Sequence, residues 1–460
     1  MKSYDVKFWA IRPGKAKTKR TYEVRWKVGH VPHSRTLGNK AQAENFLSDL
    51  RQASRTGEAF DTASGLSESL AASRRERSWF EFCLAYMDMK WPSAAPKTRD
   101  GITDALAAVI PALVYERLPD GLEVAILRSA LRHFALPPSS RDLVRPPDEA
   151  SALRWLEKAS LPVSEIGKLQ HARAALDAIS VRQDGRAASA TTIARKRSVF
   201  ANALRYAVEL GELPSSPLAR LSWKPPKVSE LVDRRVVVNQ RQARELLTAV
   251  TYVGQNTRGP YARGQRLMAF YACMYFVALR PAEAVALRVQ DCYLPSSGWG
   301  RLTLEKSRPE VNRRWTDTAS SHDERGLKHR PVTETRRVPI PAELVTILRL
   351  HIDTFGTASD DRVFGSDRGG PVASTAISDV WAEARTLALT PAQVASPLAR
   401  RPYDLRHAAV SLWLSAGVPP ARVAERAGHS VEVLLRVYAK CLDDGDQAAN
   451  TRIDVALRDA

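Results

Sequence analysis

The stretch that decides how this chain is interpreted is RPYDLRHAAVSLWLSAGVPPARVAERAGHSVEVLLRVYAK, residues 401–440. Its reactive side chains are spread along the whole stretch: Tyr403, Arg406, His407, His429 and Tyr438. Arginine, histidine and tyrosine in this order have two explanations. They can belong to a helix-turn-helix that only holds DNA, or to an active site that breaks it.

The end of the stretch fits a helix-turn-helix. Pro419 and Pro420 favour a helix start, because proline is well tolerated in the first turn of a helix. Val423 and Ala427 would face inward, Gly428 would turn the chain, and a second helix would follow. Such a pair of helices can place one of them in a groove of DNA.

The same stretch can instead supply what cleavage of a phosphodiester needs without a metal. The reaction needs a nucleophile in line with phosphorus, positive charge at the non-bridging oxygens, and a proton donor for the leaving 5′-oxygen. Arginine suits the second need, because its planar guanidinium grips phosphate through two hydrogen bonds and stays charged. Tyrosine suits the first once nearby cations favour its deprotonated form. Arg406, His429 and Tyr438 are the candidates.

Another arginine lies far upstream, in VALRPAEAVAL at 277–287. Arg280 follows the apolar run 267–279, so a buried stem could project its guanidinium into a cleft. Glu283 is the partner expected of an ordinary ion pair at a helix end. A helix-turn-helix alone explains neither this motif nor the basic β segment after it.

The charge of the chain favours a polyanionic partner. Lys and Arg total 69 against 50 Asp and Glu, a formal net charge of +19. Solubilising surfaces usually carry smaller and more mixed charge, so nucleic acid is the expected partner. Four widely spaced cysteines without a C-x-x-C pair argue against zinc and disulfides and favour a reducing cytosol. No apolar signal core begins the chain, and the run 267–279 is too short to span a bilayer, so we expect no membrane contact.

Residues 1–60 are expected to form a small α+β domain. In TYEVRWKV, at 21–28, Val24, Trp26 and Val28 alternate with polar residues, and helical spacing follows at 40–53. Arg25 and Lys27 lie on the polar face of the predicted strand. That face could enter a DNA major groove, and an ordinary solvated face explains it equally well.

The middle of the chain is expected to be helical. Residues 61–74 are rich in Ser, Ala and Gly and indicate a linker, and residues 75–225 show apolar spacing near 3.6. The helix predicted in TTIARKRSVFANALRYAVELGEL carries the expected DNA contacts near its start: Arg195, Lys196 and Arg197. The Pro-Lys segment WKPPKVSELVDRR indicates a boundary near residue 226.

The remaining residues, 226–460, mix predicted helices with one β segment. Strands are predicted at GRLTLEKS, 300–307, and at TRRVPIP, 335–341. A long, polar and basic segment lies between them.

Taken together, these motifs resemble the tyrosine recombinase (phage integrase) family. The resemblance to the catalytic domain covers roughly 240 to 445 and rests on ALRPAE, the basic β segment, YDLRHAAVSLWLSAGV, AGHS and VYA. Residues 1–60 resemble an arm-type DNA-binding domain, and 191–221 resemble part of a core-binding domain. The resemblance implies an arm domain at 1–60, a linker at 61–74, an all-α core-binding domain at 75–225, and at 226–460 a mainly α catalytic domain with a small antiparallel sheet and a C-terminal tail.

The resemblance also implies roles for individual residues. Arg280 and Arg406 match the two catalytic arginines, and Glu283 matches the acidic residue that commonly follows the first. His429 matches the histidine of the Gly-His motif. Tyr438 matches the nucleophile.

Three further positions bear on the chemistry that the resemblance implies. The family has a histidine three residues before the second arginine, and this chain has Tyr403, a poorer acid or base near neutral pH. His407 matches a frequent Arg-His pair. The family also uses a β-hairpin lysine as proton donor to the leaving oxygen. Lys306 and Lys328 are the candidates, and Lys328 is favoured by its spacing to the last strand, which makes residues 307–326 an insertion.

The reaction implied by the resemblance uses no metal, ATP or other cofactor. Tyr438 attacks the scissile phosphate, a 3′-phosphotyrosine forms and a 5′-hydroxyl leaves; a 5′-hydroxyl of a second duplex then rejoins the strands. Two rounds through a four-way junction complete the exchange. The expected partners are double-stranded attachment sites, a homotetramer on DNA, and an excisionase or DNA-bending protein. The expected place is the nucleoid in a bacterial cytoplasm.

Three rival interpretations are open. They are a helix-turn-helix regulator without chemistry, a type IB topoisomerase that relaxes DNA as a monomer, and a degenerate family member that binds but does not cut. The arm-like N-terminus favours recombination over relaxation. The segment 137–185 is longer than the family's usual and has no explanation in the sequence. The tail carries apolar Ile453, Val455 and Leu457, which would allow docking on a neighbouring subunit, as occurs in the family.

Overall fold

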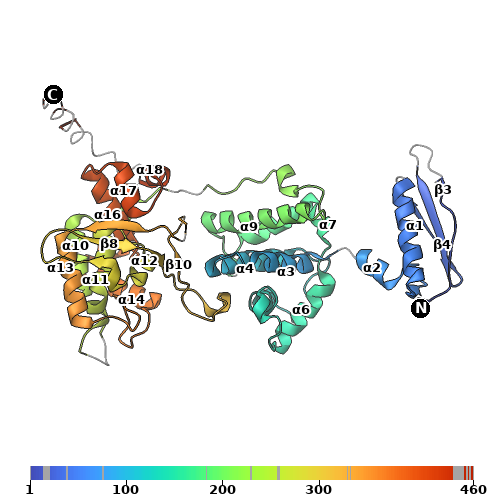
Figure 1. The fold of residues 1–460 in the computed structure, drawn as a ribbon, viewed down its shortest axis with the longest axis horizontal. Coiled ribbons are helices and arrows are strands. Elements are labelled where there is room, and N and C mark those ends of the chain that lie inside the picture. The colour runs from blue at the N-terminus through green and yellow to red at the C-terminus, as the bar shows by residue number, and fades with distance from the viewer. Residues whose placement is uncertain are drawn as a thin grey trace. The chain divides into compact units, whose positions relative to one another are not determined.

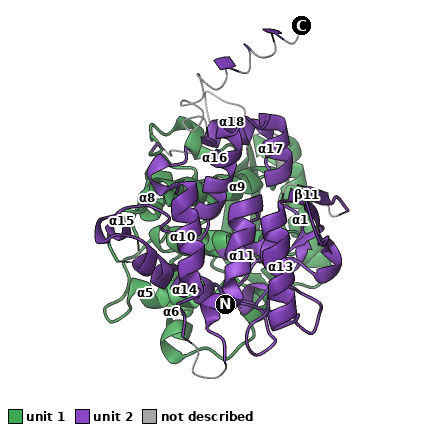
Figure 2. Cartoon of the chain, turned by 90° about the vertical axis from the view of Figure 1, so that its left-hand side faces the viewer, with its two compact units in different colours: residues 1–93, 101–226 green, residues 94–100, 227–460 purple. Residues whose placement is uncertain are grey.

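The structure, a computed structural model, describes residues 2–13, 21–37, 40–74, 77–182, 184–227, 231–255, 260–328, 330–331, 333–438, 450–451, 454 and 457–458. The chain divides into two compact units, which Figure 2 colours green and purple. Unit 1 comprises residues 1–93 and 101–226, and unit 2 comprises residues 94–100 and 227–460.

Unit 1 begins with small antiparallel sheets and one long helix. Its strands are β1 (Lys2–Ser3), β2 (Val6–Phe8), β3 (Arg12–Pro13), β4 (Tyr22–Val28), β5 (Val31–Leu37) and β6 (Phe60–Asp61), and its first helix is α1 (Lys40–Arg55). The strand β4 pairs with β2, β3 and β5 (Figure 1). The alternation predicted for β4 is present, because Val24, Trp26 and Val28 are buried in one apolar cluster with residues of α1. The predicted α+β composition of this segment is therefore confirmed.

The residues that follow α1 contact the strands of this segment. β6 pairs with β1, and the Trp26 indole Nε1 donates a hydrogen bond to the Gly65 carbonyl at 2.5 Å. The helix α2 (Glu68–Arg74) comes next. The region predicted as a linker thus holds part of a strand, a turn and a helix, and its role as a linker stays a prediction.

The rest of unit 1 is helical, as its apolar spacing predicts. Its helices are α3 (Trp79–Lys90), α4 (Pro96–Val109, of which residues 96–100 belong to unit 2), α5 (Val124–Ala130), α6 (Pro147–Ala159), α7 (Val163–Ile166), α8 (Leu169–Ser180) and α9 (Ala190–Glu209). Ser78 and Glu81 form a capping box that fixes the start of α3. Trp79, Phe82 and Phe200 are among the fully buried side chains of a single apolar core that these helices share.

Unit 2 is mainly helical with a small antiparallel sheet, as predicted. Its helices are α10 (Gln240–Val250), α11 (Arg263–Val277), α12 (Pro281–Ala286), α13 (Ala342–Phe355), α14 (Ser374–Ala388), α15 (Pro391–Ala395), α16 (Asp404–Ser415), α17 (Pro420–Ala427) and α18 (Val431–Tyr438). After its polar first turn, the helix α11 is apolar on all sides, and it packs against α10, α13, α14 and α16 (Figure 1). Residues 267–279, predicted as a buried helix, lie largely within it.

The sheet of unit 2 has the order β11–β8–β7, from β7 (Cys292–Tyr293), β8 (Gly300–Leu304) and β11 (Arg336–Ile340). Arg336 is the register partner of Leu304 and Ile340 that of Gly300. The predicted strand 300–307 is split, since Lys306 and Ser307 form a separate strand, β9 (Lys306–Ser307), that pairs with β10 (Arg325–Gly326). Residues 307 and 325–326, predicted to lie within an insertion, therefore belong to a second small hairpin.

The C-terminal helices form a smaller core of their own. Leu414 of α16, Val423 and Ala427 of α17, and Leu434 and Tyr438 of α18 are buried together. The helix α17 ends at Gly428, whose φ of +68° is left-handed. The two helices and glycine turn predicted for this stretch are confirmed.

Within the part of the chain that the structure describes, no helix is long and apolar enough to cross a membrane. Of the tail residues discussed above, Ile453 and Val455 lie outside the described residues. The boundaries at 60, 74 and 225 remain predictions, although unit 2 resumes at residue 227, next to the predicted boundary.

Candidate active site

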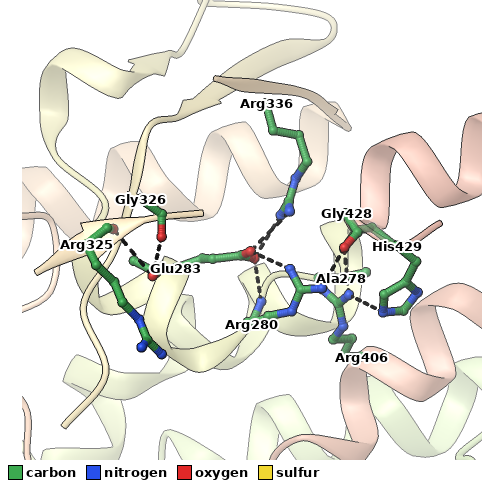
Figure 3. Close-up of polar contacts among 11 residues, drawn as sticks. Ala278, Arg280, Glu283, Arg325, Gly326, Arg336, Arg406, Gly428 and His429 are labelled. Atoms are coloured by element: carbon green, nitrogen blue, oxygen red, sulfur yellow. Dashed lines mark hydrogen bonds and ion pairs between the residues drawn. The ribbon is translucent and has the colours of Figure 1, made fainter. Parts of the chain in front are cut away.

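The predicted site residues converge around the C-terminal end of α11. This helix ends at Ala278, whose φ of +53° is left-handed, and Pro281 opens α12 directly afterwards. The sharp connection between them makes Arg280 the N-cap residue of α12. Figure 3 shows how it lies beside groups from β11, α16 and the turn after α17.

A buried carboxylate holds two of the guanidinium groups. Glu283 accepts hydrogen bonds from Arg280 Nη1 at 2.7 Å and from Arg336 Nη1 and Nη2 at 3.0 and 2.7 Å. Glu283 and Arg336 are only 1% and 2% exposed. Burial favours the protonated acid, but the charges of Arg336 and Arg280 outweigh it and lower the pKa of Glu283 to about 2. The carboxyl group is therefore ionised at neutral pH and offsets one of the two arginine charges.

Arg406 lies fully buried in the first turn of α16. Its Nη1 donates to the Ala278 carbonyl, and its Nη2 donates to the Ala427 carbonyl at 2.5 Å and to His429 Nε2 at 2.7 Å. Burial lowers the pKa of Arg406, yet an arginine keeps its proton in proteins. Its hydrogen-bond partners among the described residues are neutral groups, and the charge of Glu283 offsets its charge through space.

His429 is held in one tautomer by this contact. Because arginine can only donate, His429 Nε2 must accept, and the ring proton lies on Nδ1. Burial, then the charges of Arg406 and Arg280, lower the pKa of His429 to about 3, so the ring is neutral at pH 7. Its Nδ1 has no hydrogen-bond partner among the residues that the structure describes. This buried N–H is therefore left to donate a hydrogen bond.

Gly428 gives the arginines their space. Its carbonyl accepts from Arg280 Nη2 at 2.6 Å. A Cβ added to Gly428 would overlap Arg336 Nη1 and lie 3.1 Å from Arg280 Nη1. The Gly-His motif thus needs glycine for its left-handed backbone and for the close approach of two guanidinium groups.

Tyr438 ends α18 and is 1% exposed. Its hydroxyl is 2.8 Å from His407 Nδ1, and its ring lies 6.2 Å from that of His429 between centroids. Tyr403 is the N-cap residue of α16, and its ring meets that of His407 edge-on at 5.2 Å. The guanidinium of Arg406 lies 6.0 Å from the centroid of the Tyr403 ring. All predicted side chains of the C-terminal motif are therefore neighbours.

The two candidate lysines differ in their surroundings. Lys306 lies on β9 and forms an ion pair with Glu324 at 2.7 Å. Lys328 is exposed, two residues after β10. The structure joins neither lysine to Tyr438 or the arginines through a described hydrogen bond, so the choice between them stays a prediction.

The predicted DNA contacts lie in unit 1. Arg195 and Lys196 pair with Asp104 at 2.7 and 3.3 Å, and Arg197 lies over the Trp223 ring. Arg25 and Lys27 alternate with the buried residues of β4, so their side chains lie on the face of the sheet away from α1.

Two residues of interest were missed from the sequence. Lys7 of β2 is the register partner of Lys27, which adds a cation to the outer face of that sheet. Arg336 was predicted only as part of a strand. A signal was present, because Arg336 shares its strand face with apolar Val338 and Ile340.

The chemistry offered by the site is anion binding beside a hydroxyl group. Three guanidinium groups, from Arg280, Arg336 and Arg406, surround the single carboxylate of Glu283. They leave two positive charges in excess, and Arg280 is 17% exposed. Among the described residues, no group of three or more His, Cys, Asp or Glu side chains could hold a metal ion.

No protein-family model matches the chain, and no curated protein sequence matches it. Solved structures do resemble it. The Tn1549 transposon integrase in complex with a circular intermediate DNA is 15% identical, with a TM-score of 0.48 over 71% of this chain and 98% of that one. The lambda integrase (residues 75–356) bound to DNA is 13% identical, with a TM-score of 0.46 over 80% and 96%. The XerH site-specific recombinase bound to a palindromic difH substrate is 12% identical, with a TM-score of 0.44 over 77% and 96%.

Proposed function

We propose that this chain is a tyrosine recombinase of the integrase type, which breaks and rejoins double-stranded DNA at specific sites. The observation that carries the proposal is one buried site that groups the Tyr438 hydroxyl with an excess of arginine charge. Attack on a phosphodiester needs a nucleophile beside fixed positive charge, because negative charge grows on the non-bridging oxygens. The proposal rests on the residues of this chain.

Arg280 and Arg406 are the proposed phosphate clamp. Each now donates to a backbone carbonyl, Arg280 to Gly428 and Arg406 to Ala278 and Ala427. Phosphate oxygens would replace some of these partners and form stronger, charge-assisted hydrogen bonds. His429 would donate its Nδ1–H to a non-bridging oxygen of the same phosphate. Glu283 would fix Arg280, and Tyr403 would hydrogen-bond the phosphate.

In the proposed reaction, Tyr438 attacks phosphorus, a 3′-phosphotyrosine forms and the 5′-oxygen leaves with a proton from Lys328. The covalent bond conserves the energy of the phosphodiester, so neither ATP nor metal is required. A 5′-hydroxyl of a second duplex reverses the step and rejoins the strands. Because two duplexes are exchanged, we propose a homotetramer on DNA, at work in the nucleoid of a bacterial cell. An excisionase or a DNA-bending protein is a further proposed partner.

DNA contacts outside the site are proposed for the basic face of the first sheet and for α9. The sheet face carries Arg25, Lys27 and Lys7, and α9 carries Arg195 and Arg197 near its start. Replacing Arg25 and Lys27 by Gln should lower the slope of log affinity against log salt by about 2, because each phosphate contact contributes about one unit. An unchanged slope would show that this face is only a solvated surface.

Covalent trapping tests the central proposal. Duplexes that the protein binds would be selected from a random library, nicked near the bound site and incubated with protein in EDTA without ATP. A denaturing gel should show a protein–DNA adduct that Tyr438→Phe removes while binding persists. Tyr271→Phe, which deletes a buried hydroxyl outside the site, should keep the adduct. Tight binding without an adduct would instead support a regulator built on α17 and α18, or a degenerate recombinase.

The same assay compares the two lysines. Lys328→Ala should slow cleavage strongly, and Lys306→Ala should change it little. The reverse result would assign the proton donor to β9. Relaxation of supercoiled DNA by a monomer, without strand exchange, would identify a topoisomerase instead.

A further inference from the structure

The proton of the Tyr438 hydroxyl needs an acceptor before the oxygen can attack phosphorus. The rings of His407 and His429 lie beside this side chain, and Tyr403 lies against His407, so these three groups are the candidates. Their contacts differ enough to separate them.

His429 is excluded as the acceptor by its tautomer. Its Nε2 already accepts from Arg406 at 2.7 Å, and its Nδ1 therefore carries the proton. A ring in this state can donate to a phosphate oxygen, but it has no free lone pair for the Tyr438 proton.

Tyr403 is a weak candidate for chemical reasons. A phenol is a poor proton acceptor near neutral pH. Its described contacts are ring contacts, edge-on to His407 and beneath the Arg406 guanidinium. These contacts hold the His407 ring in place from the preceding turn of the same helix.

His407 has the required geometry. Its Nδ1 lies 2.8 Å from the Tyr438 hydroxyl oxygen, which is within hydrogen-bond distance for direct proton transfer. It stands on α16 next to Arg406, so the acceptor and the phosphate clamp share one rigid helix.

Burial and the charges around His407 keep its ring neutral, so that Nδ1 has a lone pair to accept a proton. Burial, then the positive charges of Arg406 and Arg401, lower its pKa to about 4, which keeps the ring neutral at pH 7. Tyr403 on its own helix and Tyr438 on α18 are the other titratable groups that face it. A phosphate bound at Arg406 would offset that positive charge and raise the pKa of His407. The ring would thus become a better base when the DNA arrives.

We propose that His407 is the proton acceptor for Tyr438, instead of the histidine that the family has at the position of Tyr403. The inference rests on the proposed function. His407 carries its own proton on Nε2 and accepts the Tyr438 proton at Nδ1. As the bond from the Tyr438 oxygen to phosphorus forms, the bond from phosphorus to the 5′-oxygen breaks, and that oxygen takes a proton from Lys328. Rejoining reverses each transfer and restores neutral His407.

The test is single-turnover cleavage by His407→Phe on the selected duplexes. The phenyl ring fills the same space and cannot accept a proton. At pH 7 we expect cleavage to fall by about 100-fold or more, because a lost general base usually costs that much. The rate of the variant should then rise with pH as solvent takes over deprotonation of tyrosine, whereas the wild-type rate should stay nearly flat.

A substrate with sulfur in place of the bridging 5′-oxygen distinguishes loss of the proton acceptor for Tyr438 from loss of the proton donor to the leaving group. A thiolate leaves without a proton, so this substrate should restore cleavage to Lys328→Ala. It should not restore cleavage to His407→Phe. Rescue of His407→Phe would overturn the assignment, because the histidine would then serve the leaving group.

His351 provides a matched control. It is also a buried histidine of unit 2 with a pKa lowered to about 4, and it contacts the Val363 carbonyl, outside the site. His351→Phe should leave the cleavage rate and its pH dependence unchanged.

The outcomes separate this inference from the proposed function. If the wild type forms no adduct, the proposed function itself fails. If the wild type cleaves and His407→Phe cleaves equally fast, only the inference fails. Faster cleavage by His407→Phe would also overturn it, because the contact with Tyr438 would then hold the nucleophile back.

Discussion

At the scale of single residues, Gly428 shows how closely the site is packed. Its backbone is left-handed and its carbonyl binds Arg280. The absent side chain leaves room for Arg336 and Arg280. One residue thus sets the position of two guanidinium groups.

Gly428→Ala should therefore lose both stability and activity. A left-handed L-residue costs about 1–2 kcal/mol, and the added methyl group would also push the arginines aside. A displacement of about 1 Å can cost about 100-fold in rate, so we expect at least that loss of cleavage.

The matched control is Gly298→Ala. Gly298 also has a positive φ, of +80°, but an added Cβ would meet nothing within 4 Å. Chemical denaturation should show a similar backbone cost for this variant, with cleavage intact. Equal activity losses for both variants would remove the packing explanation.

Much of the candidate site could be predicted at this scale. Spacing and residue type were enough to select Arg280, Arg406, His429 and Tyr438, and the structure brings them together, while their catalytic roles remain proposals. The tautomer of His429 could not be predicted, because it depends on a contact between residues 23 positions apart. The hydrogen bond from Arg406 to Ala278 could not be predicted for a similar reason, because Ala278 contributes only its backbone carbonyl.

At the scale of elements, the ion pair between Glu283 and Arg336 joins α12 to β11. Both groups are almost fully buried, and Arg336 Nη2 lies 2.7 Å from the carboxylate. Breaking such a pair is expensive, because it leaves a buried charge without its partner.

Arg336→Gln should destabilise the protein by about 3 kcal/mol, measured by urea denaturation. Arg337→Gln is the control, since Arg337 is the next residue on the strand and is exposed; it should change stability by less than about 0.5 kcal/mol. Adding Glu283→Gln to Arg336→Gln should recover part of the loss. If it does not, the charge pairing is not what joins these elements.

The sequence predicted which helices and strands form better than it predicted where they end. Apolar alternation and helical spacing were sufficient for β4, α9 and α11, whose buried faces follow directly from those patterns. The break between β8 and β9 was missed, because Glu305 continues the polar alternation of β8, and the chain changes its pairing partner only at Lys306. Pairing depends on distant residues, and a local pattern does not contain it.

At the scale of the whole molecule, unit 2 carries four histidines with lowered pKa values, His322, His351, His407 and His429. The values are about 4 for His351 and His407 and about 3 for His429, and burial is the first cause in each. These rings stay neutral in the folded protein at a pH where the unfolded chain takes up protons.

Stability should therefore fall as the pH drops below about 6.5, the ordinary histidine value. In this window the unfolded state binds more protons than the folded state, so acid favours unfolding. The loss should continue until the folded pKa values are reached, and below about 4.5 Glu283 should add to it, because its folded pKa is also lowered.

Urea denaturation between pH 7 and pH 4 tests this expectation. His351→Phe removes one of these four histidines and should make the decline shallower. A flat profile over this range would contradict the assignment of neutral, buried rings.

Composition bears more directly on the expected partner than on the limits of the domains. The excess of basic residues is a property of the whole sequence and needs no fold to interpret. Domain limits depend on which segments pack together, and residues 60–67 pack onto the first sheet despite their linker-like composition.

The cluster of arginines around Glu283 has a consequence for how a target is chosen. Every nucleotide carries the same phosphate, and a clamp of guanidinium groups and a histidine cannot tell one base from another. In the proposed function, the catalytic site does not distinguish the base sequence of the DNA that it cuts. The target sequence must then be recognised by other parts of the chain. Surfaces that contact bases could therefore be exchanged to redirect the proposed enzyme without altering how it breaks a strand.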